Sequence, residues 1–181
     1  MKKVTNMIAL AAMVVFTSTA MAQKFSGLDK SPADIATFPA NYKVADKYAK
    51  IVYGRPQLKG RSLAELAPAG EVWRTGANEA AEITFYKDVT LGGKDVKAGT
   101  YSLFTIPGAK EWTLILNSNL NQWGAYSYEE SADVIRIPAE VSSGKESVEA
   151  FSIMFDEADK GANLIMGWGT VRVTAPIEVK M

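Results

Sequence analysis

The strongest constraint on the fold is the spacing of short apolar runs along the chain. These runs recur about every 8 to 15 residues, with glycine, proline or other turn residues between them. Alternation of apolar and polar residues within such runs is typical of strands that bury one face. Helical periodicity is nearly absent. The pattern therefore predicts an all-β fold, an antiparallel β-sandwich or a jelly-roll-like, partly closed barrel.

The predicted strands are short, and most of them end at turn residues. Gly92 and Gly93 follow one strand as a strong hairpin-turn pair. Residues 112–117 place large apolar side chains on alternate positions, so we expect this strand to be central. Pro138 is expected to end one strand, and the Gly-Trp-Gly sequence at 167–169 is expected to separate the last two. The predicted strands cover residues 50–53, 83–86, 89–91, 100–106, 112–117, 134–137, 148–155, 163–166 and 170–173.

One short helix and an extended arm complete the predicted organisation. Ser62 is a suitable N-cap for a helix over residues 62–66, with Glu65 as its capping-box partner and Pro68 ending it. Residues 23–46 show no sustained strand or helix period. They are predicted to form an extended N-terminal arm with at most one helical turn near residues 33–36. Residues 47–181 then make up a single β-sandwich domain.

The first 22 residues have the organisation of a secretory signal peptide. Lys2 and Lys3 precede an apolar run over residues 7–16, and small residues follow up to Ala22. We expect cleavage after Ala22 and a soluble periplasmic or secreted protein. No segment approaches the roughly 20 apolar residues that a membrane-spanning helix needs.

The composition excludes several classes of chemistry. The chain has no cysteine and no histidine. Disulfides, cysteine proteases, the usual serine triad and histidine-rich zinc sites are therefore excluded. Its 20 basic residues balance 20 acidic ones, whereas nucleic-acid binding favours a basic excess. The densest acidic cluster, Asp156, Glu157 and Asp159, is either a calcium site or, as we prefer, a solvated turn. No metal or cofactor is expected.

The first candidate site is a glycine-rich block with three arginines, over residues 53–61 and 72–79. Arg55, Arg61 and Arg74 could bind the carboxylate or phosphate of a ligand through paired hydrogen bonds. They could instead pair with the protein's own carboxylates and hold the irregular loop on to the sheet. The expected internal partners are Glu65, Glu79 and Glu82.

The second candidate site is the loop over residues 119–128, which contains Trp123 and Tyr126 among several amide side chains. A flat aromatic face beside hydrogen-bonding groups is suited to a sugar ring. Alternatively, these aromatic residues plug one end of the sandwich. The three other tryptophans, Trp73, Trp112 and Trp168, are predicted to be core residues because they lie within or beside strands.

Several composite motifs resemble the bacterial domain-of-unknown-function 2911 family. The motifs are Ser-Pro-Ala-Asp at 31–34, Val-Tyr-Gly-Arg-Pro at 52–56, Lys-Gly-Arg at 59–61, Val-Trp-Arg-Thr-Gly-Ala-Asn-Glu at 72–79, Ala-Gly-Thr-Tyr-Ser-Leu at 98–103, Trp-Gly-Ala-Tyr at 123–126 and Asp-Val-Ile-Arg at 133–136. The resemblance extends from about residue 28 to residue 168. It implies an exported, single-domain, mainly β protein of the Bacteroidetes type, and it supplies no activity and no catalytic residues.

The favoured hypothesis is a non-catalytic binding module for a glycan or a small anionic ligand. A carboxylate-dependent enzyme acting on sugars, with Glu79 and Asp133 as its pair, is one alternative. An envelope structural or assembly protein that uses residues 23–46 to contact a partner is another. The candidate ligand-binding residues are Tyr53, Arg55, Arg61, Arg74, Asn78, Glu79, Trp123 and Tyr126.

Overall fold

The computed structural model describes residues 23–180. The predicted signal peptide lies outside the described residues. Among the described residues, no helix is both long and apolar enough to span a bilayer.

The described chain contains nine strands, one short α-helix and one 3-10 helix. Helix α1 (Leu63–Leu66) has Ser62 as its N-cap, with the complete capping box to Glu65 that the sequence predicts. The 3-10 helix η1 (Glu130–Ala132) directly precedes the longest strand. The strands are β1 (Ala33–Phe38), β2 (Ala49–Gly54), β3 (Ala81–Phe85), β4 (Val89–Leu91), β5 (Lys94–Val96), β6 (Gly99–Ile106), β7 (Glu111–Asn117), β8 (Asp133–Ala158) and β9 (Gly161–Val179).

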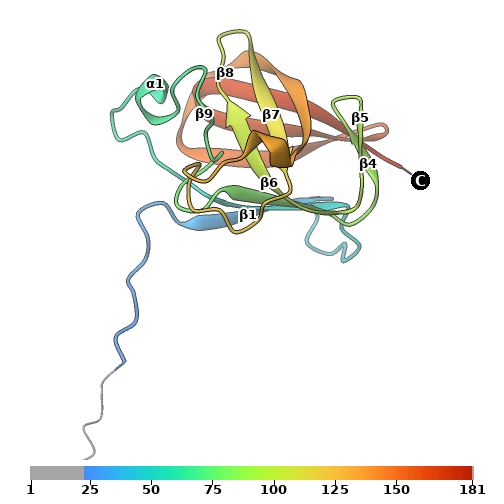
Figure 1. The fold of residues 1–181 in the computed structure, drawn as a ribbon, viewed down its shortest axis with the longest axis horizontal. Helices are drawn as coiled ribbons and strands as arrows, with labels where there is room; N and C mark the ends of the chain where they lie inside the picture. Colours follow the sequence, from blue (N-terminus) through green and yellow to red (C-terminus); the bar gives the residue numbers. More distant parts are fainter. Residues whose placement is uncertain (1–22, 181) are drawn as a thin grey trace, which may run out of the picture.

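All nine strands belong to one antiparallel sheet in the order β1-β2-β3-β6-β7-β8-β9-β4-β5. The sheet curves over on itself and encloses a core, as Figure 1 shows. It is not closed into a barrel, because β1 and β5 remain its two edges. Strand β7 lies at the centre of the order. The predicted all-β, sandwich-like fold and the central position of residues 112–117 are confirmed.

Two predicted strand breaks are wrong, because β8 and β9 form a long hairpin that runs through both of them. Pro138 lies inside β8 opposite Thr113 of β7. At this position β8 has a neighbour on one side only, because its pairing with β9 begins at Glu140, so a missing N–H is tolerated there. Gly169, with φ 56°, lies where the β8–β9 register shifts, and the strand continues through it.

Two strands escape prediction because they carry little apolar signal. Residues 33–38 form the edge strand β1, so the predicted helical turn near residues 33–36 is wrong. Strand β1 buries only Ala36 and Phe38, and backbone pairing with β2 holds it in place. Strand β5 buries only Val96. An edge strand with one or two buried residues is too short for a period-2 pattern to stand out.

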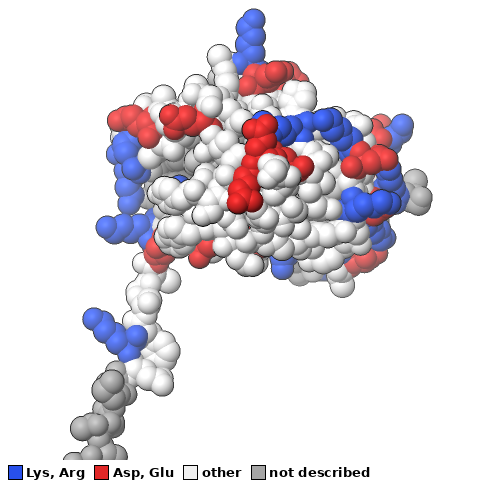
Figure 2. Space-filling view, in the orientation of Figure 1, with Lys and Arg blue, Asp and Glu red and all other residues white. Residues whose placement is uncertain are grey.

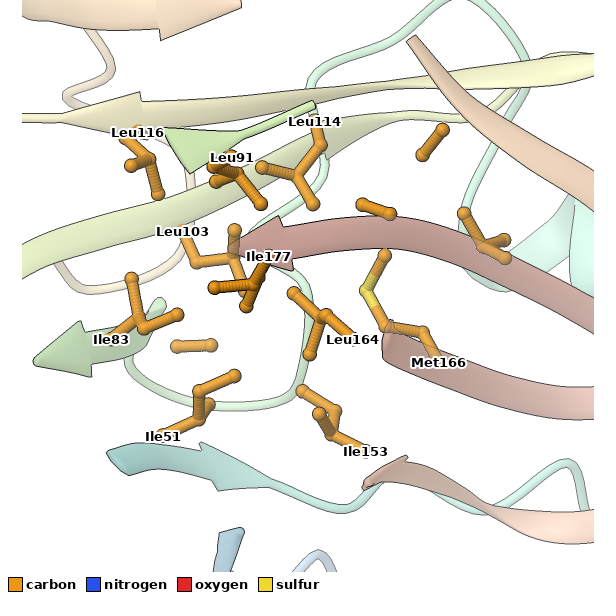
Figure 3. Close-up of a cluster of buried hydrophobic side chains, with 14 of the residues drawn as sticks. Ile51, Ile83, Leu91, Leu103, Leu114, Leu116, Ile153, Leu164, Met166 and Ile177 are labelled. Carbon is orange, nitrogen blue, oxygen red and sulfur yellow. The ribbon is translucent and has the colours of Figure 1, made fainter. Parts of the chain in front are cut away.

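The main core lies on the concave face of the sheet. Figure 3 shows side chains such as Ile51, Leu103 and Ile153 pointing toward one another from different strands. At one end of this core, Trp73 stacks on Trp168 with a centroid distance of 5.5 Å and meets Trp112 edge-on at 6.1 Å. All three tryptophans are buried, as predicted.

A second, small core lies on the outer face of β6 and β7. Phe104 and Ile115 point outward there and are fully buried, and the buried Ala80 belongs to the same cluster. The cover is the loop between β7 and β8, whose Tyr128 ring packs against Phe104 at 5.1 Å. In Figure 1 this loop and η1 pass in front of β6 and β7. The loop that carries Trp123 is therefore anchored on an apolar base.

Candidate functional site

The two halves of the glycine-rich block meet backbone to backbone. A Cβ atom on Gly54 would overlap the carbonyl oxygen of Ala77, and one on Gly76 would lie 3.0 Å from the carbonyl oxygen of Gly54. Only glycine allows an approach this close. The block therefore carries two glycines, far apart in sequence, because the end of β2 packs directly on the loop before β3.

Tyr53 and Arg55 close the seam between β2 and the second half of β8. The backbone N–H of Ile153 donates to the Tyr53 hydroxyl at 3.0 Å. Arg55 donates through Nε to the Phe151 carbonyl at 3.0 Å, through Nη2 to Ser152 Oγ at 2.7 Å and through Nη1 to Asp34 at 2.9 Å. These side chains take the place of a neighbouring strand along this part of β8.

The chain that follows Arg55 continues the same seam. The N–H of Phe151 donates to the Pro56 carbonyl at 2.8 Å, and the N–H of Leu58 donates to the Glu149 carbonyl at 3.0 Å. Arg61 then folds back on its own loop, with its guanidinium donating to the carbonyls of Leu58 and Gln57 at 3.1 and 2.9 Å. Arg61 thus stabilises a local turn.

Arg74 differs from the other two arginines of the block. Its Nε atom is buried and has no hydrogen-bond partner among the described residues. The predicted pairing of the three arginines with glutamates is wrong: within residues 23–180 their one ion pair joins Arg55 to Asp34. Backbone carbonyls on the loop and on β8 satisfy Arg55 and Arg61 in place of glutamates.

An open groove of about 510 Å³ lies beside this junction. Its walls come from the segment before β1, the end of β2, the loop that leads into β3 and the loop after β7. The lining residues are Asp29, Ser31, Ala33, Val52, Tyr53, Gly54, Ala77, Asn78, Glu79, Ala80, Glu82, Asn121 and Trp123. The volume is within the range of small-molecule pockets, about 300–1,000 Å³.

Trp123 is held in this groove by backbone pairing and is nevertheless exposed. It forms an isolated antiparallel bridge with Glu79. On either side of the bridge, the N–H of Gly124 donates to the Asn78 carbonyl at 3.0 Å, and the N–H of Ala80 donates to the Gln122 carbonyl at 2.8 Å. Trp123 is 62% exposed, so the alternative that it plugs the sandwich is wrong. Its backbone is fixed while its ring faces solvent.

The bends on both sides of this bridge use residues in left-handed conformations. Asn78 has φ 63° and Asn121 has φ 57°, and asparagine tolerates this region better than most residues. The N–H of Asn121 also donates to Glu82 Oε1 at 2.8 Å. These contacts fix the loop against β3.

A polar cluster braces the same loop at its far end. Asp133 accepts hydrogen bonds from Asn117 Nδ2 at 2.8 Å, from the Tyr128 hydroxyl at 2.6 Å and from Arg136 Nε at 2.6 Å. Burial, followed by the hydrogen bond to Asp133, raises the pKa of Tyr128 to about 12. The hydrogen bond to Asp133 also raises the pKa of Arg136. Both oxygens of Asp133 are thus occupied by the fold.

Among residues 23–180, those that line the groove include acidic side chains and no arginine or lysine. Its three carboxylates are those of Asp29, Glu79 and Glu82. Hydrogen bonds from the backbone of Ser31 and then from the side chain of Asn78 lower the pKa of Asp29. Among residues 23–180, no group of three or more acidic side chains is arranged to hold a metal ion. The cluster over residues 156–159 is exposed at the β8–β9 hairpin.

The structure divides the predicted site residues into two groups. Tyr53, Asn78, Glu79 and Trp123 line the groove together. Arg55, Arg61, Arg74 and Tyr126 do not line it, and Tyr126 is 85% exposed on the outer part of the loop.

Sequence reasoning missed several lining residues, notably Asp29, Ser31, Glu82 and Asn121. Asn121 and Trp123 stand in one amide-rich loop, which was a usable signal. Asp29 and Ser31 come from the segment before β1, and their position depends on the pairing of β1 with β2. Nothing in their local sequence marks them as part of a groove.

Comparison with known proteins identifies the family of this chain. No curated protein and no solved structure shows a significant match to the chain. A family model described as a protein of unknown function, DUF2911, matches residues 31–177. This match spans the sheet from just before β1 to Ile177, near the end of β9, and it includes both halves of the glycine-rich block. The chain therefore belongs to the DUF2911 family.

Proposed function

We propose that this protein is a non-catalytic glycan-binding module whose site is the groove at Trp123. The observation that carries the proposal is the exposed Trp123 ring in a groove whose walls present Asn78, Glu79 and Asn121. A sugar ring has an apolar face that stacks on an aromatic plane and hydroxyls that hydrogen-bond to amides and carboxylates. Trp123 supplies the plane, and the neighbouring side chains supply the polar edge.

The groove favours a glycan over a small anion. A small anion is bound best by positively charged donors, and none of the described residues that line the groove is an arginine or a lysine. Arg55 and Arg61 are already engaged by β8 and by the loop. Carboxylates on the groove walls would repel an anion and would accept hydrogen bonds from sugar hydroxyls.

The groove also favours binding over hydrolysis. The predicted pair of Glu79 and Asp133 does not meet in one pocket, because Asp133 does not line the groove and is occupied by its own cluster. A glycosidase needs one carboxyl group that holds a proton near neutral pH. Asp29, which lies in the groove, has a lowered pKa and is therefore an acceptor rather than a proton donor.

We further propose that binding takes place outside the cytoplasm. This part of the proposal rests on the signal-peptide pattern of residues 1–22, in which two lysines precede an apolar run and a small-residue cleavage site. N-terminal sequencing of the protein recovered from a secreting host would test it. The expected first residue is Gln23, and a mature protein that begins at Met1 would contradict it.

The binding proposal is tested by screening the purified protein against an oligosaccharide array and following hits by tryptophan fluorescence. The three other tryptophans are buried, so quenching by iodide should report mainly on Trp123. A bound glycan is expected to protect this fluorescence. Trp123→Ala should abolish binding, because the stacking plane is lost.

The matched control is Tyr126→Ala, which removes an exposed aromatic ring from the same loop but outside the groove. It should keep the affinity of the parent protein within about twofold, since surface substitutions away from a site have small effects. Equal loss of binding in both variants, or no glycan bound at all, would overturn the proposal.

A further inference from the structure

The charged side chains on the groove walls are all acidic. Asp29, Glu79 and Glu82 all lie on these walls, and no lysine or arginine of the described part of the chain joins them there. Lys30 is next to Asp29 in the sequence but does not line the groove. No carboxylate of this trio takes part in an ion pair within residues 23–180.

Glu79 has the least internal role of the three carboxylates. Asp29 accepts the N–H of Ser31 at 2.7 Å, and Glu82 accepts the N–H of Asn121 at 2.8 Å. The Glu79 side chain is exposed and makes no hydrogen bond to another described residue, although its backbone is fixed opposite Trp123. It is therefore a carboxylate held beside an aromatic ring and left free for a ligand.

An indole ring and a carboxylate side by side both attract a cation. The face of tryptophan carries the strongest cation–π attraction among the aromatic side chains. An ionised carboxylate forms charge-assisted hydrogen bonds with an ammonium group, which are stronger than those with a hydroxyl. A sugar that carries a protonated amine would use both groups, whereas a neutral sugar would use only the ring and ordinary hydrogen bonds.

We propose that the preferred ligand is a glycan with free, protonated amino groups, that is, an amino sugar without its N-acetyl substituent. This inference rests on the proposed glycan-binding function and specifies its ligand. Figure 2 shows acidic and basic side chains interspersed on the face in view, with no broad acidic area there, so general attraction of a polycation to that face is not expected. The preference should arise at the groove.

A matched pair of oligosaccharides tests the inference: the hexamer of β-1,4-linked glucosamine and the hexamer of N-acetylglucosamine. Calorimetric titrations are run at mildly acidic pH, where the sugar amines are protonated and unperturbed carboxyl groups are still mostly ionised. The free-amine hexamer is expected to bind at least about tenfold more tightly, in keeping with the strength of hydrogen bonds between charged groups. Added salt should reduce this difference.

Two variants test whether the preference for the free-amine hexamer arises at Glu79. Glu79→Gln should bring the two affinities to within about threefold, because the amide keeps the shape and removes the charge. The control is Glu71→Gln, an exposed glutamate outside the groove, which should leave the preference unchanged. Glu79 has no internal partner, so the variant is expected to fold normally, and a melting curve checks this.

The possible outcomes separate this inference from the function on which it rests. If both hexamers bind equally and Trp123→Ala abolishes both, the inference is overturned and glycan binding stands. If the amine hexamer binds equally well to the parent protein and to Trp123→Ala, attraction is non-specific and the inference is overturned. If neither hexamer binds but another neutral glycan does, the inference alone fails, and if no glycan binds, both proposals fail.

Discussion

The two halves of the glycine-rich block meet at Gly54 and Ala77, but their side chains differ in how far the fold uses them. Tyr53 and Arg55, in the first half, are tied into the seam with β8 by hydrogen bonds to Ile153, Phe151 and Ser152. The Glu79 side chain, at the end of the second half, makes no hydrogen bond to another residue of the described part of the chain and lines an open groove. Arg55 and Arg61, two of the residues with the most suggestive chemistry in the sequence, therefore stabilise the fold, and the less conspicuous Glu79 is the residue for which we propose a binding role.

The tryptophans show the same contrast. Trp73, Trp112 and Trp168 pack together in the core, whereas Trp123 is fixed by its backbone and exposes its ring. A side chain that the fold does not use, on a backbone that the fold holds firmly, is a better sign of a binding site than the residue type alone.

Replacement of a tryptophan by alanine should give the largest contrast in stability. Trp73→Ala is expected to lower the free energy of unfolding by about 3–5 kcal/mol, because it leaves a cavity beneath Trp168 and Phe151. Trp123→Ala should change it by less than about 0.5 kcal/mol, since the ring is on the surface. Urea unfolding measures both. Similar losses in the two variants would contradict the distinction between core and site.

The next largest loss of stability is expected at the glycine junction, where Gly54 packs on Ala77. Gly54→Ala places a methyl group against the Ala77 carbonyl and should cost about 1–3 kcal/mol, the usual penalty of overpacking. Gly27→Ala is the control, because a Cβ there meets nothing within 4 Å. The same unfolding experiment applies. A neutral Gly54→Ala would mean that the two halves of the block do not meet as described.

Arg55 should contribute more to the stability of the fold than Arg61. Arg55→Met removes the hydrogen bonds to Phe151, Ser152 and Asp34 and should destabilise the protein by about 1–3 kcal/mol. Arg61→Met removes only exposed contacts within a turn and should cost less than about 1 kcal/mol. Thermal melting compares the two variants. If Arg55→Met retained the parent stability but lost glycan binding, Arg55 would belong to the site rather than to the seam.

The smallest expected effect concerns Tyr128. The pH dependence of the free energy of unfolding that this residue causes is measurable only at alkaline pH. Its pKa of about 12 in the folded protein lies above the ordinary value of 10.0, so the folded state holds this proton more tightly than the unfolded state. The resulting stabilisation is fully present below pH 10 and is lost as the pH rises through about 12. Titration followed by tyrosinate absorbance should show a late-ionising tyrosine that is missing in Tyr128→Phe. Tyrosines that all ionise near pH 10 would contradict the brace at Asp133.

The sequence was sufficient to predict the parts of the fold that carry their own local signal. Alternation over residues 112–117 indicated a central strand, and the Ser62–Glu65 spacing indicated the capping box, because both depend on near neighbours in the chain. Strand β1 could not be predicted, since it buries only two side chains and its pairing with β2 is a contact between separate segments of the chain. Pro138 misled the strand assignment because its tolerance depends on where β9 begins to pair.

The candidate site was predictable only in part, for a related physical reason. Trp123 and Asn78 stood out as residue types in irregular segments. The bridge that brings Trp123 to Glu79 is a long-range backbone contact, and Asp29 reaches the groove only because β1 joins the sheet. The choice between ligand binding and internal pairing for each arginine likewise depended on partners such as Ser152, which are distant in the sequence.

The most direct test of the central claim is the response of the four indole N–H signals of 15N-labelled protein to the glucosamine hexamer. The signal of Trp123, assigned with Trp123→Phe, is expected to shift on titration. The signals of Trp73, Trp112 and Trp168 should stay in place, because these rings are buried in the core. Binding that moves the core signals and leaves Trp123 unchanged would place the ligand elsewhere and contradict the account.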